Sequence, residues 1–295
     1  MKNKFNLIIA ILIVLLFFDV SFLGKLDAMN WPSENAVLLQ NFGFNDNGKP
    51  VLGMMFNEGT NILAAESGEV IFSRDKNETV SRLPSPLGSW TAVDHEDGLI
   101  SIYSRYENNS VTLTQVEKSQ PIAASGISGW SEQNGFYFMI FDRRERHWIN
   151  PAMIVMPAQG TRPPQILSVD FRNSQGVMMQ SGSPAAPRNL NQGRYTVIVN
   201  TFSPALTGSR LAPQRIICSI NGAEAASLNF ETFSSRDGIL MVYRNGLVPA
   251  KQVYSTSSAF EAAEINLTRG QANLEIIVQD INGNSSTLLT RLIVN

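Results

Sequence analysis

The feature that most constrains the fold is a series of short β-rich runs, bounded by turn-forming residues, that continues from residue 61 to the C-terminus. Examples are FYFMIF (136–141), YTVIVNTF (195–202), RIICSING (215–222) and LEIIVQDINGN (274–284). Strands separated by turn signals are typical of all-β proteins, and long helical periodicity is hard to find beyond residue 30. The sequence therefore predicts an all-β chain.

Five dipeptides between these runs combine Asn or Asp with Gly, a pair that accepts the positive φ angles of tight hairpin turns. They are Asp97-Gly98, Asn221-Gly222, Asp237-Gly238, Asn245-Gly246 and Asn282-Gly283. Each predicts a turn between two antiparallel strands.

The N-terminus begins with basic residues and continues with an almost wholly apolar run over residues 5–18. This pattern is that of a secretory signal over residues 1–28, with an uncleaved membrane anchor as the alternative. Either interpretation predicts that the remaining chain is exported to the periplasm or cell envelope. A membrane contact is expected only through this segment if it is retained.

Paired prolines mark the clearest internal boundary, at residues 157–164, where a stiff extended linker is expected. The sequence therefore predicts a first domain over residues 31–156 and a second over 163–295.

Composition excludes several functional classes. The formal net charge of −2 argues against a nucleic-acid-binding protein. The single cysteine, Cys218, excludes an internal disulfide and any Cys-rich metal site, and the two histidines exclude a multi-His metal site. We expect no cofactor.

Five segments of the first domain resemble, in order, the LytM/M23 zinc metallopeptidases that cut peptidoglycan cross-links. NEGTNILAAESGEV (57–70) resembles the family's EGTPVLAAADGVV, and WTAVDHEDGLISIY (90–103) resembles VVIDHGNGYSTLY. VTLTQVEKSQPIAASGISG (111–129) resembles VKVGQKVKKGQPIGTVGSTG, GFYFMIF (135–141) stands in the place of GPHLHFEI, and WINP (148–151) resembles the closing xxNP. The resemblance implies an M23-like antiparallel β domain.

The residues that would hold zinc in such a domain are replaced. The family's HxxxD segment corresponds to Val51-Leu-Gly-Met-Met55, its YxH to Tyr103-Ser-Arg105, and its HxH to Phe136-Tyr-Phe138. A hydrolytic zinc site needs three ligands and an open position for water, and Val, Met and Phe do not supply them. We therefore expect no metal site, no catalytic residue and no peptidase activity.

Aromatic and thioether side chains stand where the metal would be. Phe136 and Phe138 share one strand face because strand side chains alternate. Two interpretations follow: a cleft that has filled in and become core, or an apolar groove, formed with Val51 and Met55, that binds a peptide or protein. Arg105, in the YxH place, offers a carboxylate-binding fork at the rim.

Neither histidine has a catalytic context of its own. His95 matches a non-ligand histidine of the family's DHGNG hairpin and is expected to be structural. His147 follows the charged stretch 142–146 and is expected in a solvated loop.

The second domain reads as an antiparallel β-sandwich of about seven strands. Candidate strands cover residues 166–171, 194–200, 214–220, 226–233, 238–243, 262–267, 273–280 and 288–294. The closing pattern around Asp280-x-x-Gly283-Asn284 resembles bacterial Ig-like and cadherin-like modules. We interpret Asp280 as a turn residue, with a calcium site as the alternative, and Cys218 as a buried core thiol.

Together these observations predict a non-catalytic envelope protein, an M23 pseudopeptidase fused to an Ig-like module. The family resemblance implies that it binds peptidoglycan or regulates a cell-wall hydrolase. A structural or assembly protein that acts only through contacts with envelope proteins is the alternative, and an active zinc endopeptidase is a third hypothesis.

Overall fold

The computed structural model describes residues 28–57, 61–75, 85–107, 113–130, 133–155, 160–180, 183–254 and 259–295. We call residues 28–155 the N-terminal half and residues 160–295 the C-terminal half. The expected signal or anchor segment lies outside the described residues. Among those that are described, no helix is long and apolar enough to span a bilayer.

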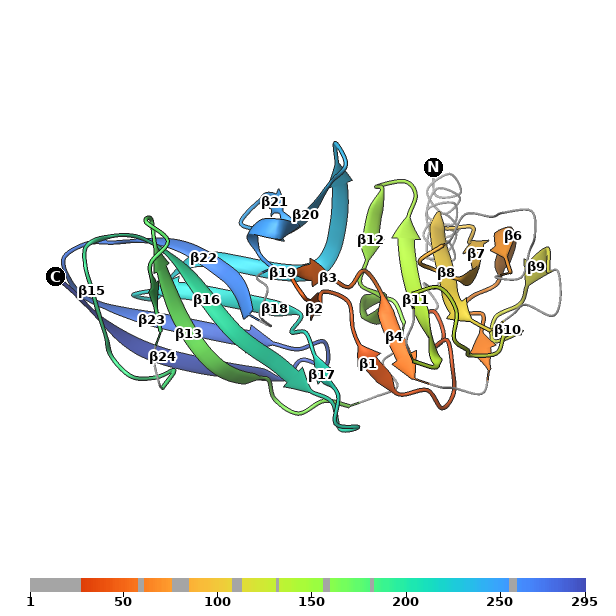
Figure 1. The fold of residues 1–295 in the computed structure, drawn as a ribbon, viewed down its shortest axis with the longest axis horizontal. Helices are drawn as coiled ribbons and strands as arrows, with labels where there is room; N and C mark the ends of the chain where they lie inside the picture. The colour runs from red at the N-terminus through yellow and green to blue at the C-terminus, as the bar shows by residue number, and fades with distance from the viewer. Residues whose placement is uncertain are drawn as a thin grey trace, which may run out of the picture.

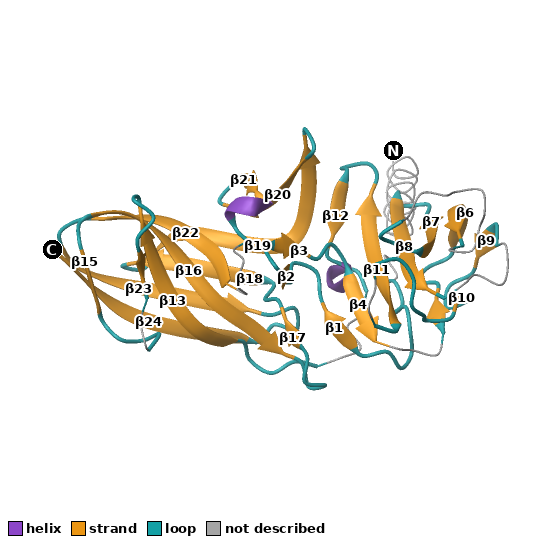
Figure 2. Cartoon of the chain, in the orientation of Figure 1, coloured by secondary structure: helices purple, strands orange, loops and turns teal. Residues whose placement is uncertain are grey.

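The described chain is built from β-strands, as predicted, with two short 3-10 turns, η2 (Pro151–Met153) and η3 (Ala250–Gln252), and no α-helix (Figure 2). The strands of the N-terminal half are β1 (Leu38–Gln40), β2 (Asn45–Asp46), β3 (Lys49–Pro50), β4 (Met54–Asn57), β5 (Ile62–Leu63), β6 (Gly68–Arg74), β7 (Ser89–Asp94), β8 (Leu99–Tyr106), β9 (Gln115–Val116), β10 (Pro121–Ala123), β11 (Gly135–Asp142) and β12 (His147–Ile149). Those of the C-terminal half are β13 (Gln165–Asn173), β14 (Met178–Met179), β15 (Arg188–Leu190), β16 (Gly193–Pro204), β17 (Arg210–Leu211), β18 (Arg215–Ile220), β19 (Ala223–Arg236), β20 (Ile239–Arg244), β21 (Leu247–Pro249), β22 (Ala259–Leu267), β23 (Gly270–Gln279) and β24 (Ser285–Val294).

All five predicted hairpin turns connect antiparallel strands. Three of them, at Asn221-Gly222, Asp237-Gly238 and Asn245-Gly246, have positive φ at both residues, as tight turns between twisted strands require. They join β18 to β19, β19 to β20, and β20 to β21. The other two join β7 to β8 and β23 to β24.

β11 organises the N-terminal half. It pairs with β8 along one edge and with β4 and β12 along the other, and the sheet continues from β8 through β7 and β6 to β9. Its buried face holds Phe136, Phe138 and Ile140, which pack with Phe56 and Tyr103 in a hydrophobic core.

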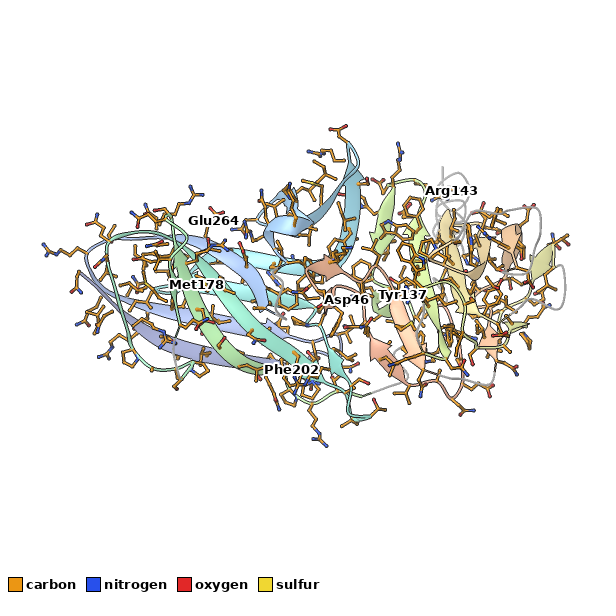
Figure 3. All side chains as sticks on the ribbon, in the orientation of Figure 1. Asp46, Tyr137, Arg143, Met178, Phe202 and Glu264 are labelled. Carbon is orange, nitrogen blue, oxygen red and sulfur yellow. The ribbon has the colours of Figure 1, made fainter. Side chains whose placement is uncertain are left out.

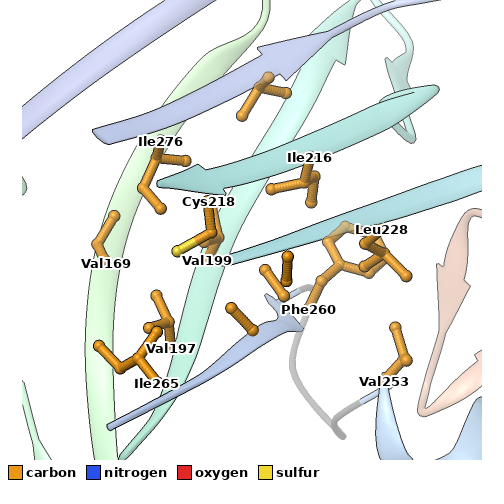
Figure 4. Packing of buried hydrophobic residues seen from close by; sticks show 14 of the residues in the cluster. Val169, Val197, Val199, Ile216, Cys218, Leu228, Val253, Phe260, Ile265 and Ile276 are labelled. Carbon is orange, nitrogen blue, oxygen red and sulfur yellow. The ribbon is translucent and has the colours of Figure 1, made fainter. Parts of the chain in front are cut away.

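The C-terminal half is a sandwich of two sheets. One contains β14, β13, β16, β17 and β22, and the other contains β15, β24, β23, β18, β19, β20 and β21. Val197 and Val199 of the first sheet face Cys218 and Ile276 of the second in a shared core (Figure 4). All eight candidate strands are present as β13, β16, β18, β19, β20, β22, β23 and β24.

One strand pair of the predicted antiparallel sandwich is parallel. β15 runs parallel to β24, with Leu190 opposite Val294. Residues Arg188–Leu190 of β15 lie along residues Leu292–Val294 of β24, and the two strands point in the same direction.

The two halves share one sheet and exchange core residues. β12 of the N-terminal half pairs with β19 of the C-terminal half, which makes a continuous sheet from β9 to β15 (Figure 1). Phe42 lies in the C-terminal core, and Ala205 and Leu211 lie in the N-terminal core. Residues on each side of the predicted boundary therefore pack in the core of the other half.

His147 corrects a prediction. It begins β12, lies opposite Asp142 on one side and Ser234 on the other, and is half-buried. The charged loop is only residues 143–146, a turn between β11 and β12. The charge pattern of 142–147 could not reveal that a second strand, β19, would pair with residue 147.

Candidate functional site

The residues expected at the metal-ligand and catalytic-histidine positions of an M23-like domain do not form one site. Phe138 of β11 is paired with Met54, and Tyr137 is paired with Met55. Because neighbouring side chains on a strand point to opposite faces, Met55 and Phe138 lie on opposite faces of the β4–β11 sheet. The idea that Met55 and Phe138 share one groove is therefore wrong.

Phe136 and Phe138 belong to the core. Both side chains are 0% exposed. Phe136 stacks on Phe56, with ring centroids 4.7 Å apart, and Phe138 contacts Tyr103 at 5.2 Å. These two side chains are part of the core and do not line a groove. Of the two interpretations of Phe136 and Phe138, a cleft that has filled in is therefore the correct one.

Val51 precedes β4 in the chain and is not part of the β4–β11 pairing. It is half-buried, and its backbone exchanges hydrogen bonds with the segment around Phe44: its N–H donates to Phe44 O at 2.9 Å, and its C=O accepts from Gly43 N–H at 2.8 Å. These contacts close the β2–β3 hairpin, which reaches toward the C-terminal half.

Met55, Tyr137 and Arg105 meet on the face opposite the core. The guanidinium carbon of Arg105 lies 5.1 Å from the centroid of the Tyr137 ring, and its Nη1 lies 3.7 Å from Met55 Sδ. The Tyr137 oxygen accepts a hydrogen bond from Leu52 N–H at 2.8 Å. Burial raises the pKa of the Tyr137 phenol above its ordinary value, so the phenol stays neutral beneath the cation.

A β-bulge aims Arg105 at this face. Ser89 of β7 pairs with Tyr106 and Trp90 pairs with Ser104, which leaves Arg105 as the extra residue of β8. Its φ is +65°, and its N–H donates to Leu87 O at 2.8 Å. Ser104 and Arg105 therefore both point away from the core, whereas regular alternation would send residue 105 to the core face beside Tyr103.

Arg105 opens onto a cleft of about 470 Å³ at the junction of the two halves. From the N-terminal half the cleft is lined by Leu39, Gln40, Met55, Arg105, Trp130 and Gln133. Phe44 and Asp46 at β2 add to its wall, and β17 of the C-terminal half contributes Arg210. Figure 3 labels Tyr137 on β11 and Asp46 on β2, where the two halves meet.

The residues expected at the metal-ligand positions do not have the chemistry to hold zinc. Val51 and Phe138 offer only hydrocarbon, and Met55 offers a single thioether on the far face of the sheet. Within the described ranges, no group of three or more His, Cys, Asp or Glu side chains is arranged to hold a metal ion.

His95 is buried, and both of its ring nitrogens have partners. Nδ1 lies 2.8 Å from Ser67 O, and Nε2 lies 2.9 Å from Ser101 Oγ. The ring ties the β7–β8 hairpin to the start of β6, which is the structural role expected of it.

Asp280 is a turn residue, as predicted. Its Oδ1 accepts hydrogen bonds from the N–H groups of Asn282 and Asn284, at 2.9 and 2.8 Å. Its Oδ2 accepts from Thr161 Oγ1 at 2.5 Å and from Asn284 Nδ2 at 2.9 Å. The carboxylate therefore fastens the segment that enters the C-terminal half to the β23–β24 turn.

Sequence reasoning identified Met55 and Arg105 but missed the residues that complete the cleft. Gln40, Asp46, Trp130, Gln133 and Arg210 carry no local motif, and Arg210 lies more than a hundred positions from Arg105 along the chain. Only the junction of the two halves brings them together.

The strand arrangement around β11, together with the segments that lead to it, defines an M23-like β domain. Residues 52–151 match the sequence profile of Peptidase family M23, and a second family profile, which has no description, matches residues 163–295. No curated protein matches the chain.

Solved structures similar to this chain share low identity with it. One is the SpoIIQ–SpoIIIAH pore-forming complex, at 22% identity over 44% of this chain and 92% of that chain, with a TM-score of 0.36. Another is the catalytic domain of the prophage-encoded M23 protein EnpA from Enterococcus faecalis, at 19% identity over 42% and 94% of the two chains, with a TM-score of 0.35. The antimicrobial peptidase lysostaphin from Staphylococcus simulans aligns over 73% of this chain and 86% of its own, at 14% identity and a TM-score of 0.35.

Proposed function

We propose that this protein is a non-catalytic component of the cell envelope whose M23-like domain binds peptidoglycan without cutting it. The observation that carries the proposal is the burial of Phe136 and Phe138, which stand where the family has HxH and pack against Phe56 and Tyr103. A water-activating metal has neither ligands nor space at these positions.

The location of the protein is part of the proposal. The basic start and apolar run of residues 1–28 support export, either as a cleaved signal or as an anchor that keeps the rest of the chain outside the membrane. We also propose that the C-terminal sandwich is an Ig-like module. Its shared sheet with the M23-like domain supports a role in holding the binding surface rigid.

The first test is co-sedimentation of residues 28–295 with purified sacculi, combined with metal analysis and an assay for cross-link cleavage. We expect a saturable bound fraction, no stoichiometric zinc and no cleavage. Stoichiometric zinc accompanied by cleavage would overturn the non-catalytic assignment.

Absence of saturable binding to sacculi would overturn the peptidoglycan assignment. In that case the alternative would be favoured, an assembly or regulatory protein that contacts envelope proteins such as a cell-wall hydrolase. Affinity capture with the same residues 28–295 would then identify the partner.

A further inference from the structure

We propose that the cleft between the two halves binds a peptide through a free carboxylate, with Arg105 and Arg210 as the two cations that recognise it. This inference deepens the proposed function, because the peptide stems of peptidoglycan carry free carboxylates.

Arg105 is the first support. The Nε of its guanidinium is buried without a hydrogen-bond partner. The guanidinium contacts the Met55 thioether through Nη1 and lies over the Tyr137 ring. No carboxylate of the described chain forms an ion pair with it. A half-buried guanidinium with one unpaired buried donor and one donor on a weak thioether acceptor gains strongly from an anionic ligand, because charged hydrogen bonds compensate the lost hydration.

The backbone at Arg105 is the second support. Its φ of +65° lies in the left-handed region, which is strained for an ordinary residue and which Gly or Asn adopts more readily. The bulge that requires this conformation also turns the side chain from the core to the cleft. A strained position that holds a long cation, aimed into a cavity, indicates that the cation itself is used.

Arg210 is the third support, because it brings a second cation to the same cleft from the other half. Its guanidinium carbon lies 4.7 Å from the centroid of the Phe202 ring, and no described carboxylate pairs with it. Among the described residues that line the cleft, Asp46 is the only acidic one, so this described lining of two arginines and one aspartate has a net charge of +1. That balance suits a monoanion such as a carboxylate.

The remaining wall suits a peptide. Trp130 is 75% exposed, an unusual exposure for so large an apolar ring, and Gln40 and Gln133 also line the cleft. A volume of about 470 Å³ is in the range of ordinary ligand sites and holds a few peptide residues. An arginine guanidinium donates two parallel hydrogen bonds to the two oxygens of a carboxylate. A peptide amide has one oxygen and no charge, so it cannot accept both of these hydrogen bonds.

The test measures the affinity of two labelled peptides for residues 28–295 by fluorescence anisotropy. One is a peptidoglycan stem pentapeptide that ends in D-Ala-D-Ala and whose internal carboxyl groups are amidated, and the other is an acetylated pentapeptide of L-residues without acidic side chains. Each is used with a free C-terminal carboxylate and as the amide. We expect at least one of the two peptides to bind at least about tenfold more tightly as the free acid than as the amide. A tenfold difference in affinity corresponds to the free energy of a hydrogen bond to a charged group.

Two variants locate the site. Arg105→Gln and Arg210→Gln should each weaken binding of the free acid at least about tenfold and leave binding of the amide nearly unchanged. Arg210 has no positive φ, so Arg210→Gln keeps the test valid if Arg105→Gln disturbs the bulge. Arg144→Gln, at an exposed position in the β11–β12 turn, is the matched control and should bind like the unaltered protein.

Equal binding of acid and amide, or normal binding by both arginine variants, would overturn the carboxylate site. If sacculi were still bound in a saturable way, the proposed function would stand without it. If the L-peptide bound through both arginines while sacculi and the stem peptide did not, the carboxylate site would stand, its source would be a protein C-terminus, and the peptidoglycan assignment would fall.

Discussion

Asn41 and Ala212 exchange two hydrogen bonds across 171 positions of the chain. Asn41 Nδ2 donates to Ala212 O at 3.0 Å, and Ala212 N–H donates to Asn41 Oδ1 at 2.6 Å. The amide side chain thus satisfies a buried backbone group of the C-terminal half as a neighbouring strand would. Beside it, Tyr254 Oη donates to Gly43 O at 2.8 Å, so residues 41–43 are built into the second half.

Removal of the Asn41 amide should destabilise the whole described chain. Asn41→Ala leaves the N–H and C=O of Ala212 unpaired and buried, at about 1–3 kcal/mol for each group. Urea unfolding would measure the loss, and Asn266→Ala, on an exposed position of β22, should stay within about 0.5 kcal/mol of the unaltered protein. A loss below that margin for Asn41→Ala would mean that water replaces the amide.

The close approach at Gly43 gives a second prediction. Gly43 has φ of +79°, and an added Cβ would lie 2.9 Å from the Phe230 ring, whereas Gly222 has φ of +82° and nothing within 4 Å. Both Gly→Ala substitutions meet the strain of a positive φ, about 1–2 kcal/mol. Gly43→Ala should cost about 1–3 kcal/mol more than Gly222→Ala in urea unfolding, because the core must shift. Equal losses would contradict the packing of this loop against Phe230.

Phe138 should affect stability and not ligand binding. Phe138→Ala opens a cavity in the core and should cost about 3–5 kcal/mol. Phe72→Ala, on a ring that is 46% exposed, should cost much less. Sacculus binding by the folded fraction of Phe138→Ala should match that of the unaltered protein. A selective loss of binding with little change in the unfolding midpoint would show that Phe138 faces a ligand after all.

Stability should fall at alkaline pH. Burial raises the pKa of the Cys218 thiol from 9.0 to about 12 and that of the Tyr103 phenol from 10.0 to about 12. The folded state thus favours the neutral forms, so the stabilisation is complete below the unfolded pKa values and is lost as pH rises toward 12. Between the unfolded and the folded pKa of each group, the free energy of unfolding falls by about 1.4 kcal/mol per pH unit.

The urea midpoint followed from pH 7 to 11 would test this expectation. The unaltered protein should hold a constant midpoint to about pH 8.5 and then decline. Cys218→Ala should start lower because of its cavity but should decline less between pH 9 and 10. Parallel curves for the two proteins would show that the Cys218 thiol does not contribute to the alkaline loss.

The strands, the turns and the M23-like character of residues 52–151 were predictable from the sequence, because each depends on local pattern. The alternation of apolar and polar residues located the candidate strands of the C-terminal half to within a few residues. The Asn-Gly and Asp-Gly pairs located the hairpin turns, because these residues adopt positive φ at low cost.

What only the tertiary structure decided was which of these residues meet. The bulge at Arg105 depends on the register between β7 and β8, and it moves one side chain from the core face to the cleft. The pairing of β12 with β19, the Asn41–Ala212 contact and the approach of Arg210 to the cleft all join segments far apart in the chain. The secondary-structure propensity of a short segment does not indicate which distant segment it will contact. These contacts form because two hydrophobic cores pack on either side of a shared sheet.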